Sequence, residues 1–153
     1  MSDKEAVITA ETKISVNLED ARAWFFSLKE HPERYEFATH DGFEFVQGDF
    51  GEVGARFETR ERFFGLRITL RFELTELDST HFCFRLIKPS FPIWGAFVLE
   101  DEAAHITRLR LEIGALSPFG GFFLRFPLVR QAIRRQIERE VEHVRASMES
   151  VLG

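Results

Sequence analysis

The amino-acid sequence predicts an α+β fold in which a curved antiparallel sheet of about seven strands wraps around a long C-terminal α-helix. Between residues 42 and 114, apolar and charged residues alternate, which is typical of antiparallel strands with one solvated face. From residue 118 onward, apolar residues instead recur every three or four positions, as they do along one stripe of an α-helix. A helix of this length needs a broad surface to pack against, and the preceding strands supply one.

Residues 6–16 alternate loosely and contain β-branched side chains, which favours a first or edge strand. Asn17 is the expected N-cap of a helix, with Asp20 as the acidic residue three positions later. This helix should end before the His31-Pro32 step, because a residue that precedes proline avoids the helical region. Residues 32–35 are expected to form one further turn, so two short helices lie between the first two strands.

Six further strands are predicted, at residues 43–45, 57–63, 66–74, 81–88, 94–102 and 104–114. Gly65 suits a tight hairpin between two of them.

Within the strand at 57–63, Thr59 and Glu61 share the parity of Phe57 and Phe63. If those phenylalanines face the helix, Glu61 points inward too, where burial would raise the pKa of its carboxyl and mark it as a candidate functional residue. The alternatives are that Glu61 lies beyond the rim of the core, or that a β-bulge turns it to the other face.

The closing helix should extend for roughly 37 Å over residues 128–152. Pro127 predicts either a restart of the helix, with the proline in its first turn, or a kink. The face opposite the apolar stripe alternates arginine and glutamate and is interpreted as solvated. An alternative is that arginines near its start serve an anionic ligand or a lipid headgroup, since the helix dipole disfavours cations there. These arginines are Arg125, Arg130, Arg134 and Arg135.

Composition limits the function classes. The 153 residues predict a single domain over the whole chain, 1–153, and a net charge of -5 argues against nucleic-acid binding. The sequence shows neither a basic-apolar leader nor a run of roughly 20 apolar residues, so we expect a cytoplasmic protein without a transmembrane segment. Phe occurs 18 times, which predicts a Phe-rich core, a Phe-lined cavity, or both.

Metal chemistry is not expected. Cys83 is the single cysteine, which excludes an intramolecular disulfide and a zinc site built from several cysteines. The five histidines are scattered, without a second ligand at metal-binding spacing. We therefore expect no metal and no cofactor.

The chain resembles the START, or SRPBCC, superfamily, the helix-grip group that includes polyketide cyclases and lipid-transfer domains. The residues that carry the resemblance are 31–34, 51–57, 94–97 with 107–109, and the helix lead-in at 118–121. Together they span nearly the whole chain. The resemblance implies a helix-grip fold with an internal apolar pocket that binds, carries or transforms its ligand.

The leading hypothesis is that a small hydrophobic ligand, lipid-like or polycyclic, binds between the long helix and the sheet. The aromatic wall candidates are Phe45, Phe57, Phe72, Phe84, Trp94, Phe97, Phe122 and Phe126. The candidates for orienting polar groups are Tyr35, His40, Thr59 and Glu61. His40 is expected in the loop before the second strand, near the mouth of the pocket.

Two other functions stay open. A polyketide cyclase/dehydratase-like enzyme would use the same pocket, with Glu61 and His40 as the candidate acid or base, and it needs at least two convergent titratable groups there. A partner-binding or co-chaperone-like module needs an exposed apolar patch instead. A homodimer is also left open.

Overall fold

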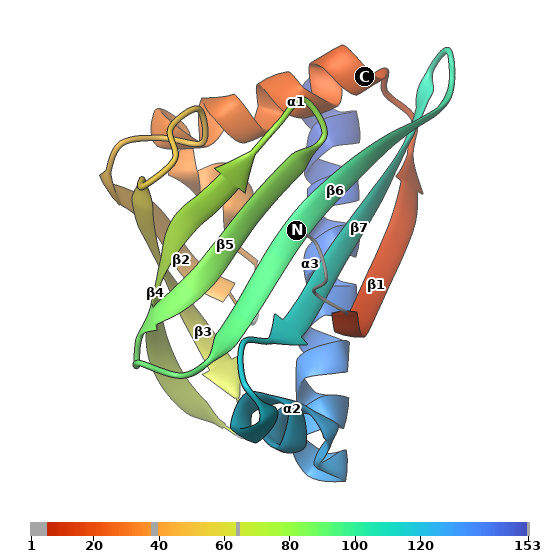
Figure 1. The fold of residues 1–153 in the computed structure, drawn as a ribbon. Coiled ribbons are helices and arrows are strands. Elements are labelled where there is room, and N and C mark those ends of the chain that lie inside the picture. The colour runs from red at the N-terminus through yellow and green to blue at the C-terminus, as the bar shows by residue number, and fades with distance from the viewer. Residues whose placement is uncertain (1–5, 38–39, 64, 153) are drawn as a thin grey trace.

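The computed structural model describes residues 6–37, 40–63 and 65–152. Its elements follow the predicted order and confirm the α+β helix-grip architecture (Figure 1). The helices are α1 (Leu18–Phe26), the 3-10 turns η1 (Ser27–Lys29) and η2 (Pro32–Tyr35), α2 (Pro118–Arg125) and α3 (Pro127–Leu152). The strands are β1 (Ala6–Ile14), β2 (His40–Gln47), β3 (Arg56–Phe63), β4 (Leu66–Leu77), β5 (His81–Lys88), β6 (Ile93–Ala103) and β7 (Ile106–Ala115).

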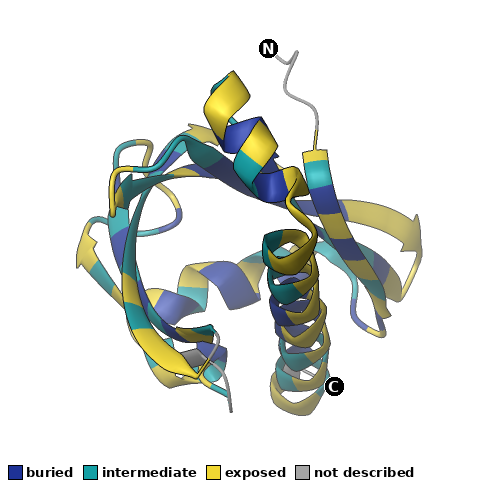
Figure 2. Ribbon diagram, turned by 90° about the horizontal axis from the view of Figure 1, so that it is seen from below, coloured by how far each residue is buried: buried dark blue, intermediate teal, exposed yellow. Residues whose placement is uncertain are grey.

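Within the described residues the strands form one antiparallel sheet of seven, in the order β1-β7-β6-β5-β4-β3-β2. Strands β2 to β7 form a meander, and β1 joins its far edge beside β7. The sheet curves, and α3 lies across the mouth of the curve, as the view from below shows (Figure 2). The concave face of the sheet is therefore the face that the helix covers.

Local sequence explains where the early elements begin and turn. The side chain of Asn17 accepts a hydrogen bond from the backbone N–H of Asp20 at 2.8 Å, which caps α1 as predicted. Gly65 has a φ of 76°, a left-handed conformation that glycine adopts without steric cost, at the tight turn between β3 and β4.

The C-terminal segment consists of two helices. Ser117 caps α2 by accepting from the N–H of Gly120, and Phe126 ends it with an extended backbone, ψ 125°. Pro127 then occupies the first turn of α3, where its missing N–H costs no hydrogen bond. Of the two predicted outcomes at Pro127, the structure has the restart. The expectation of one continuous apolar stripe from Phe122 onward is therefore wrong.

The core lies between α3 and the sheet. Ile137, Val141, Val144 and Met148 are buried on the inward face of α3, and each such side chain contributes about 1.5–3 kcal/mol through burial. At the other side of the core, the indole N–H of Trp24 in α1 donates to the hydroxyl of Ser147, 3.0 Å away.

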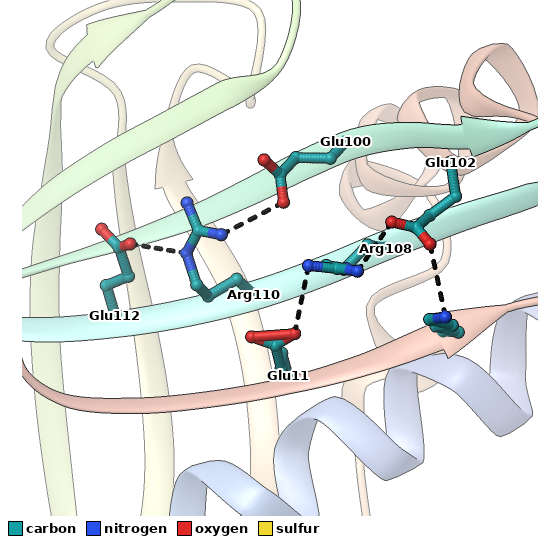
Figure 3. Close-up of polar contacts among 7 residues, drawn as sticks. Glu11, Glu100, Glu102, Arg108, Arg110 and Glu112 are labelled. Carbon is teal, nitrogen blue, oxygen red and sulfur yellow. Dashed lines mark hydrogen bonds and ion pairs between the residues drawn. The ribbon is translucent and has the colours of Figure 1, made fainter.

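The outer face of the sheet is charged. Arg108 lies 3.6 Å from Glu11 and 2.7 Å from Glu102, and Arg110 lies 2.7 Å from Glu112 (Figure 3). Solvent-exposed pairs of this kind contribute about 0–1 kcal/mol each. These pairs make the convex face polar over parts of β1, β6 and β7, so an apolar ligand site is expected on the concave face.

Candidate functional site

A cavity of about 120 Å³ lies between the concave face of the sheet and α3. Its apolar lining comes from the sheet and from one face of α3: Phe43, Phe57, Phe63, Leu70, Phe72, Phe84, Leu86, Ile93, Phe97, Leu111, Ile113, Ile133 and Ile137. Its polar lining is Tyr35, Thr59, Glu61, Gln136 and Glu140. The site is thus a pocket walled by rings, with its polar groups from η2, β3 and α3.

Strand register brings the aromatic rings into contact. Phe57 is in register with Phe72 on β4, and their rings stack with centroids 5.3 Å apart. The ring of Phe57 also stacks on Phe43 at 5.3 Å and meets Phe84 edge-on at 5.7 Å. Such pairs add about 0.5–1.5 kcal/mol beyond their buried area. The wall is therefore a connected set of rings.

The polar groups are hydrogen-bonded to one another. The hydroxyl of Thr59 donates to one carboxyl oxygen of Glu61 at 2.6 Å, and the amide of Gln136 donates to the other at 3.4 Å. The phenol of Tyr35 donates to Glu140 at 2.7 Å. Elements far apart in the sequence meet here, since η2, β3 and α3 each supply part of the site.

Burial controls the protonation of both carboxyl groups. Removal from water raises the pKa of Glu61 to about 7, although the hydrogen bonds from Thr59 and Gln136 oppose the shift. Burial, followed by repulsion from the charge of Glu61, raises the pKa of Glu140 well above its ordinary value. Burial and then the charge of Glu140 raise the pKa of Tyr35. The two carboxyls repel each other's charge, so they take up a proton rather than ionise together near neutral pH.

The structure places many of the sequence-predicted residues at the cavity wall, namely Tyr35, Phe57, Thr59, Glu61, Phe72, Phe84 and Phe97. Glu61 faces inward because β3 runs without a bulge against β4, in unbroken register from Arg56 to Phe63. His40 is not in a loop as predicted: it begins β2, paired in register with Glu61. Its side chain lies outside the described residues.

Four wall candidates lie elsewhere. Phe45 is half-buried beside the cavity, where its ring contacts Phe50 and Phe57 at 5.0 and 5.7 Å. Trp94 is on the opposite face of the sheet, packed with Ala96 and Val98, because alternation along β6 turns Ile93 and Phe97 inward.

Phe122 and Phe126 are 71% and 50% exposed. They point away from the cavity because the chain breaks at Pro127, and the inward face of α2 is formed by Gly120, Gly121 and Leu124 instead.

Sequence reasoning missed Gln136 and Glu140. Both fall in the stripe of Ile133 and Ile137, at spacings of three or four residues, so helical periodicity by itself places them on the inward face. The position of Glu140 within an apolar helical stripe was therefore a signal in the sequence that this glutamate faces the sheet.

Among the described residues no group of three or more His, Cys, Asp or Glu side chains is placed to hold a metal ion. Nor does any helix in the described ranges have the length and apolar character to span a membrane.

No protein-family profile matches the chain, and no curated protein sequence matches it. Its fold is nevertheless shared with solved structures. An aromatase/cyclase, Zhui, from a Streptomyces species superposes with a TM-score of 0.73 at 12% identity over 95% of this chain and 94% of that one. A START superfamily protein from Mycobacterium smegmatis gives 0.62 at 10% identity, covering 95% of both chains.

Norcoclaurine synthase from Thalictrum flavum, solved in complex with dopamine and hydroxybenzaldehyde, gives a TM-score of 0.63 at 11% identity over 95% of this chain and 84% of that one. At such identities the likeness concerns the fold: the chain has the helix-grip fold of START/SRPBCC-type proteins.

Proposed function

We infer that this protein binds a small, largely apolar ligand in the cavity between the sheet and α3. The observation that carries the proposal is the cavity itself, walled by phenylalanine rings and aliphatic side chains, with Glu61 and Glu140 among its few polar groups. Ligand sites are typically apolar pockets in which a small number of polar groups orient the ligand. The structural neighbours, which include an aromatase/cyclase and a synthase solved with two small molecules, support this function.

The volume limits the ligand. A cavity of about 150 Å³ holds a benzene molecule, and the cavity here measures about 120 Å³. In this conformation it therefore accommodates no more than about one small ring. A lipid-like or polycyclic ligand requires the wall to move, and the half-buried lining residues Phe63, Leu86, Ile93 and Ile133 mark the side on which it can extend toward solvent.

We expect toluene, 2-naphthol and decanoic acid to be useful probes, each raising the thermal unfolding temperature by an amount that grows with the logarithm of its concentration relative to its Kd. Phe72→Trp should weaken binding by about tenfold, because the larger ring fills part of the cavity. Thr69→Trp, on the exposed outer side of the same strand, is the control and should leave binding unchanged. If no probe stabilises the parent, and Phe72→Trp costs about 1–3 kcal/mol of stability, the cavity behaves as filled core and the proposal fails.

A second candidate is acid–base catalysis of the cyclase/dehydratase kind, favoured by the convergence of Glu61, Glu140 and Tyr35 on one cavity. A carboxylate can take the proton from a carbon next to a carbonyl group. A protonated carboxyl can give its proton to a leaving hydroxyl, which departs as water. Since the pair takes up a proton near neutral pH, it can supply both forms in one site.

Exchange of the central methylene protons of a phenyl-substituted 1,3-diketone into deuterated water, followed by NMR, tests this chemistry. We expect acceleration by the parent protein and a loss of at least about a hundredfold in Glu61→Gln and Glu140→Gln. Glu138→Gln, exposed on the same helix, should retain the parent rate. A diketone that stabilises the parent but exchanges at the buffer rate would exclude catalysis and leave the binding function standing.

A further inference from the structure

The surface formed by α2 and the start of α3 is apolar and exposed. Phe119, Phe122, Phe126 and Leu128, here called the α2 face, are 61, 71, 50 and 63% exposed. Phe119, Phe122 and Phe126 recur at three- and four-residue spacing, so a single side of the segment carries them. Large phenylalanine side chains gathered in this way mark an interaction surface rather than scattered surface residues.

Packing holds this face outward. Gly120 and Gly121 are buried where α2 meets the sheet, and a Cβ on Gly120 would collide with the carbonyl oxygen of Pro92. The close approach permits α2 to lie against the end of the sheet (Figure 1), and Phe119 and Phe122 of α2 remain exposed. On the rim, the ring of Phe119 meets Phe91 edge-on at 5.5 Å.

Positive charge accompanies the apolar side chains. Residues 118–137 include four arginines and no acidic residue, in a chain whose net charge is -5. All four, Arg125, Arg130, Arg134 and Arg135, are exposed, and none makes an ion pair with a residue that the structure describes.

The balance of charges along α3 is the reverse of what the helix dipole favours, because four of its five arginines lie in its first half and three of its four glutamates lie in its second. The helix dipole therefore gives no reason for the arginines in the first half of α3, whereas contact with an external anion would.

A groove of about 270 Å³ lies where the apolar α2 face meets the arginines of α3. It is lined by Arg62, Arg135 and Arg139 together with Leu128 of the α2 face. Phe63 and Gln136 line both this groove and the ligand cavity, so the groove adjoins the candidate site. Guanidinium groups form bidentate hydrogen bonds with phosphate oxygens, so the groove suits a phosphate-bearing headgroup.

We propose that the α2 face and the adjoining arginine groove dock this protein on an anionic phospholipid surface, with the phenylalanines in the acyl region and the arginines on headgroup phosphates. The combination of exposed aromatic side chains with arginines is the one that interfacial segments use. A second copy of the chain is a poorer occupant, because a two-fold interface would place the same arginines opposite one another. If the cavity binds an apolar ligand as proposed above, docking at this surface would place the groove, and with it the adjoining cavity, next to the membrane that holds such a ligand.

Co-sedimentation with phosphatidylcholine vesicles, with and without phosphatidylserine, tests the proposal on the full chain. We expect binding to the anionic vesicles that weakens at high salt. Phe122→Asp should lower the partition coefficient by about tenfold or more, and each of Arg135→Glu and Arg139→Glu by at least about fivefold. Val53→Asp and Lys29→Glu, exposed positions outside the surface, are the matched controls and should bind as the parent does.

A second measurement reports geometry. Brominated acyl chains should quench the added emission of Phe122→Trp and not that of Val53→Trp. Absence of binding, equal binding to neutral and anionic vesicles, or binding that survives Phe122→Asp would each overturn the proposal. So would a dimer in sedimentation velocity that Phe122→Asp dissociates, since a second copy would then cover the face. Toluene should still raise the unfolding temperature of Phe122→Asp, which shows that the cavity is intact when membrane binding is lost.

Discussion

Val141→Asp is expected to lower the free energy of unfolding by about 3–5 kcal/mol. The side chain of Val141 is 2% exposed on the inward face of α3. An aspartate there must either lose its hydration or take up a proton, and the buried polar and charged residues of the described chain include no Lys or Arg to compensate it. Because domains of this size are stable by about 5–15 kcal/mol, the variant should be at the edge of unfolding.

Urea unfolding followed by circular dichroism measures the effect. Ala146→Asp is the matched control, because it introduces the same charge at an exposed position of the same helix and should cost less than about 1 kcal/mol. If the two variants unfolded alike, α3 would not be held against the sheet by its apolar face.

Stability should fall as pH rises from about 5 to about 8. The pKa of Glu61 is raised from 4.5 to about 7 in the folded protein. Between these values the folded state keeps a proton that the unfolded state has lost, so unfolding releases a proton and the free energy of unfolding decreases with pH. The full loss is on the order of 3 kcal/mol. Glu140, whose pKa is also raised by burial, acts in the same direction.

Other carboxyls act at lower pH. Hydrogen bonds from Arg85 lower the pKa of Glu73, and those from the backbone of Thr80 lower the pKa of Asp78. Their contribution is present above their ordinary pKa values and is lost as the pH falls through the lowered ones. Maximum stability is therefore expected near pH 5, at the acidic end of the usual range.

Urea titrations between about pH 5 and pH 8 check this dependence. Glu61→Gln keeps an acceptor for Thr59 but cannot ionise, so its stability should vary less with pH than that of the parent, and the double variant with Glu140→Gln least of all. Glu138→Gln, exposed on α3, should retain the slope of the parent. A parent whose stability is constant or rises over this range would show that the two carboxyls are not buried together.

Much of the fold followed from periodicity. Shared parity with Phe57 and Phe63 predicted that Thr59 and Glu61 point inward if those phenylalanines do, and the structure has both buried on the inward face of β3. The cap at Asn17 and the turn at Gly65 were also predictable, because each depends on a few residues close together in the chain.

The remainder of the site required tertiary structure. Periodicity assigns a side chain to a face of its own element, but it does not say which face meets a neighbouring element or how far away that neighbour lies. Trp94 shows that periodicity does not say which face of a strand meets the helix, because either side of β6 could have been the concave one. Phe122 shows that periodicity does not carry across a break in a helix, because the break at Pro127 turned α2 independently of α3.

The sequence by itself determined the strands, the parity that Glu61 shares with Phe57 and the apolar stripe of α3. Tertiary structure decided that Glu140 meets Tyr35 and shares a cavity with Glu61, and that this cavity has a volume of about 120 Å³. The physical reason is that these properties depend on the curvature of the sheet and on its separation from α3. Both are set by the packing of side chains from many elements at once.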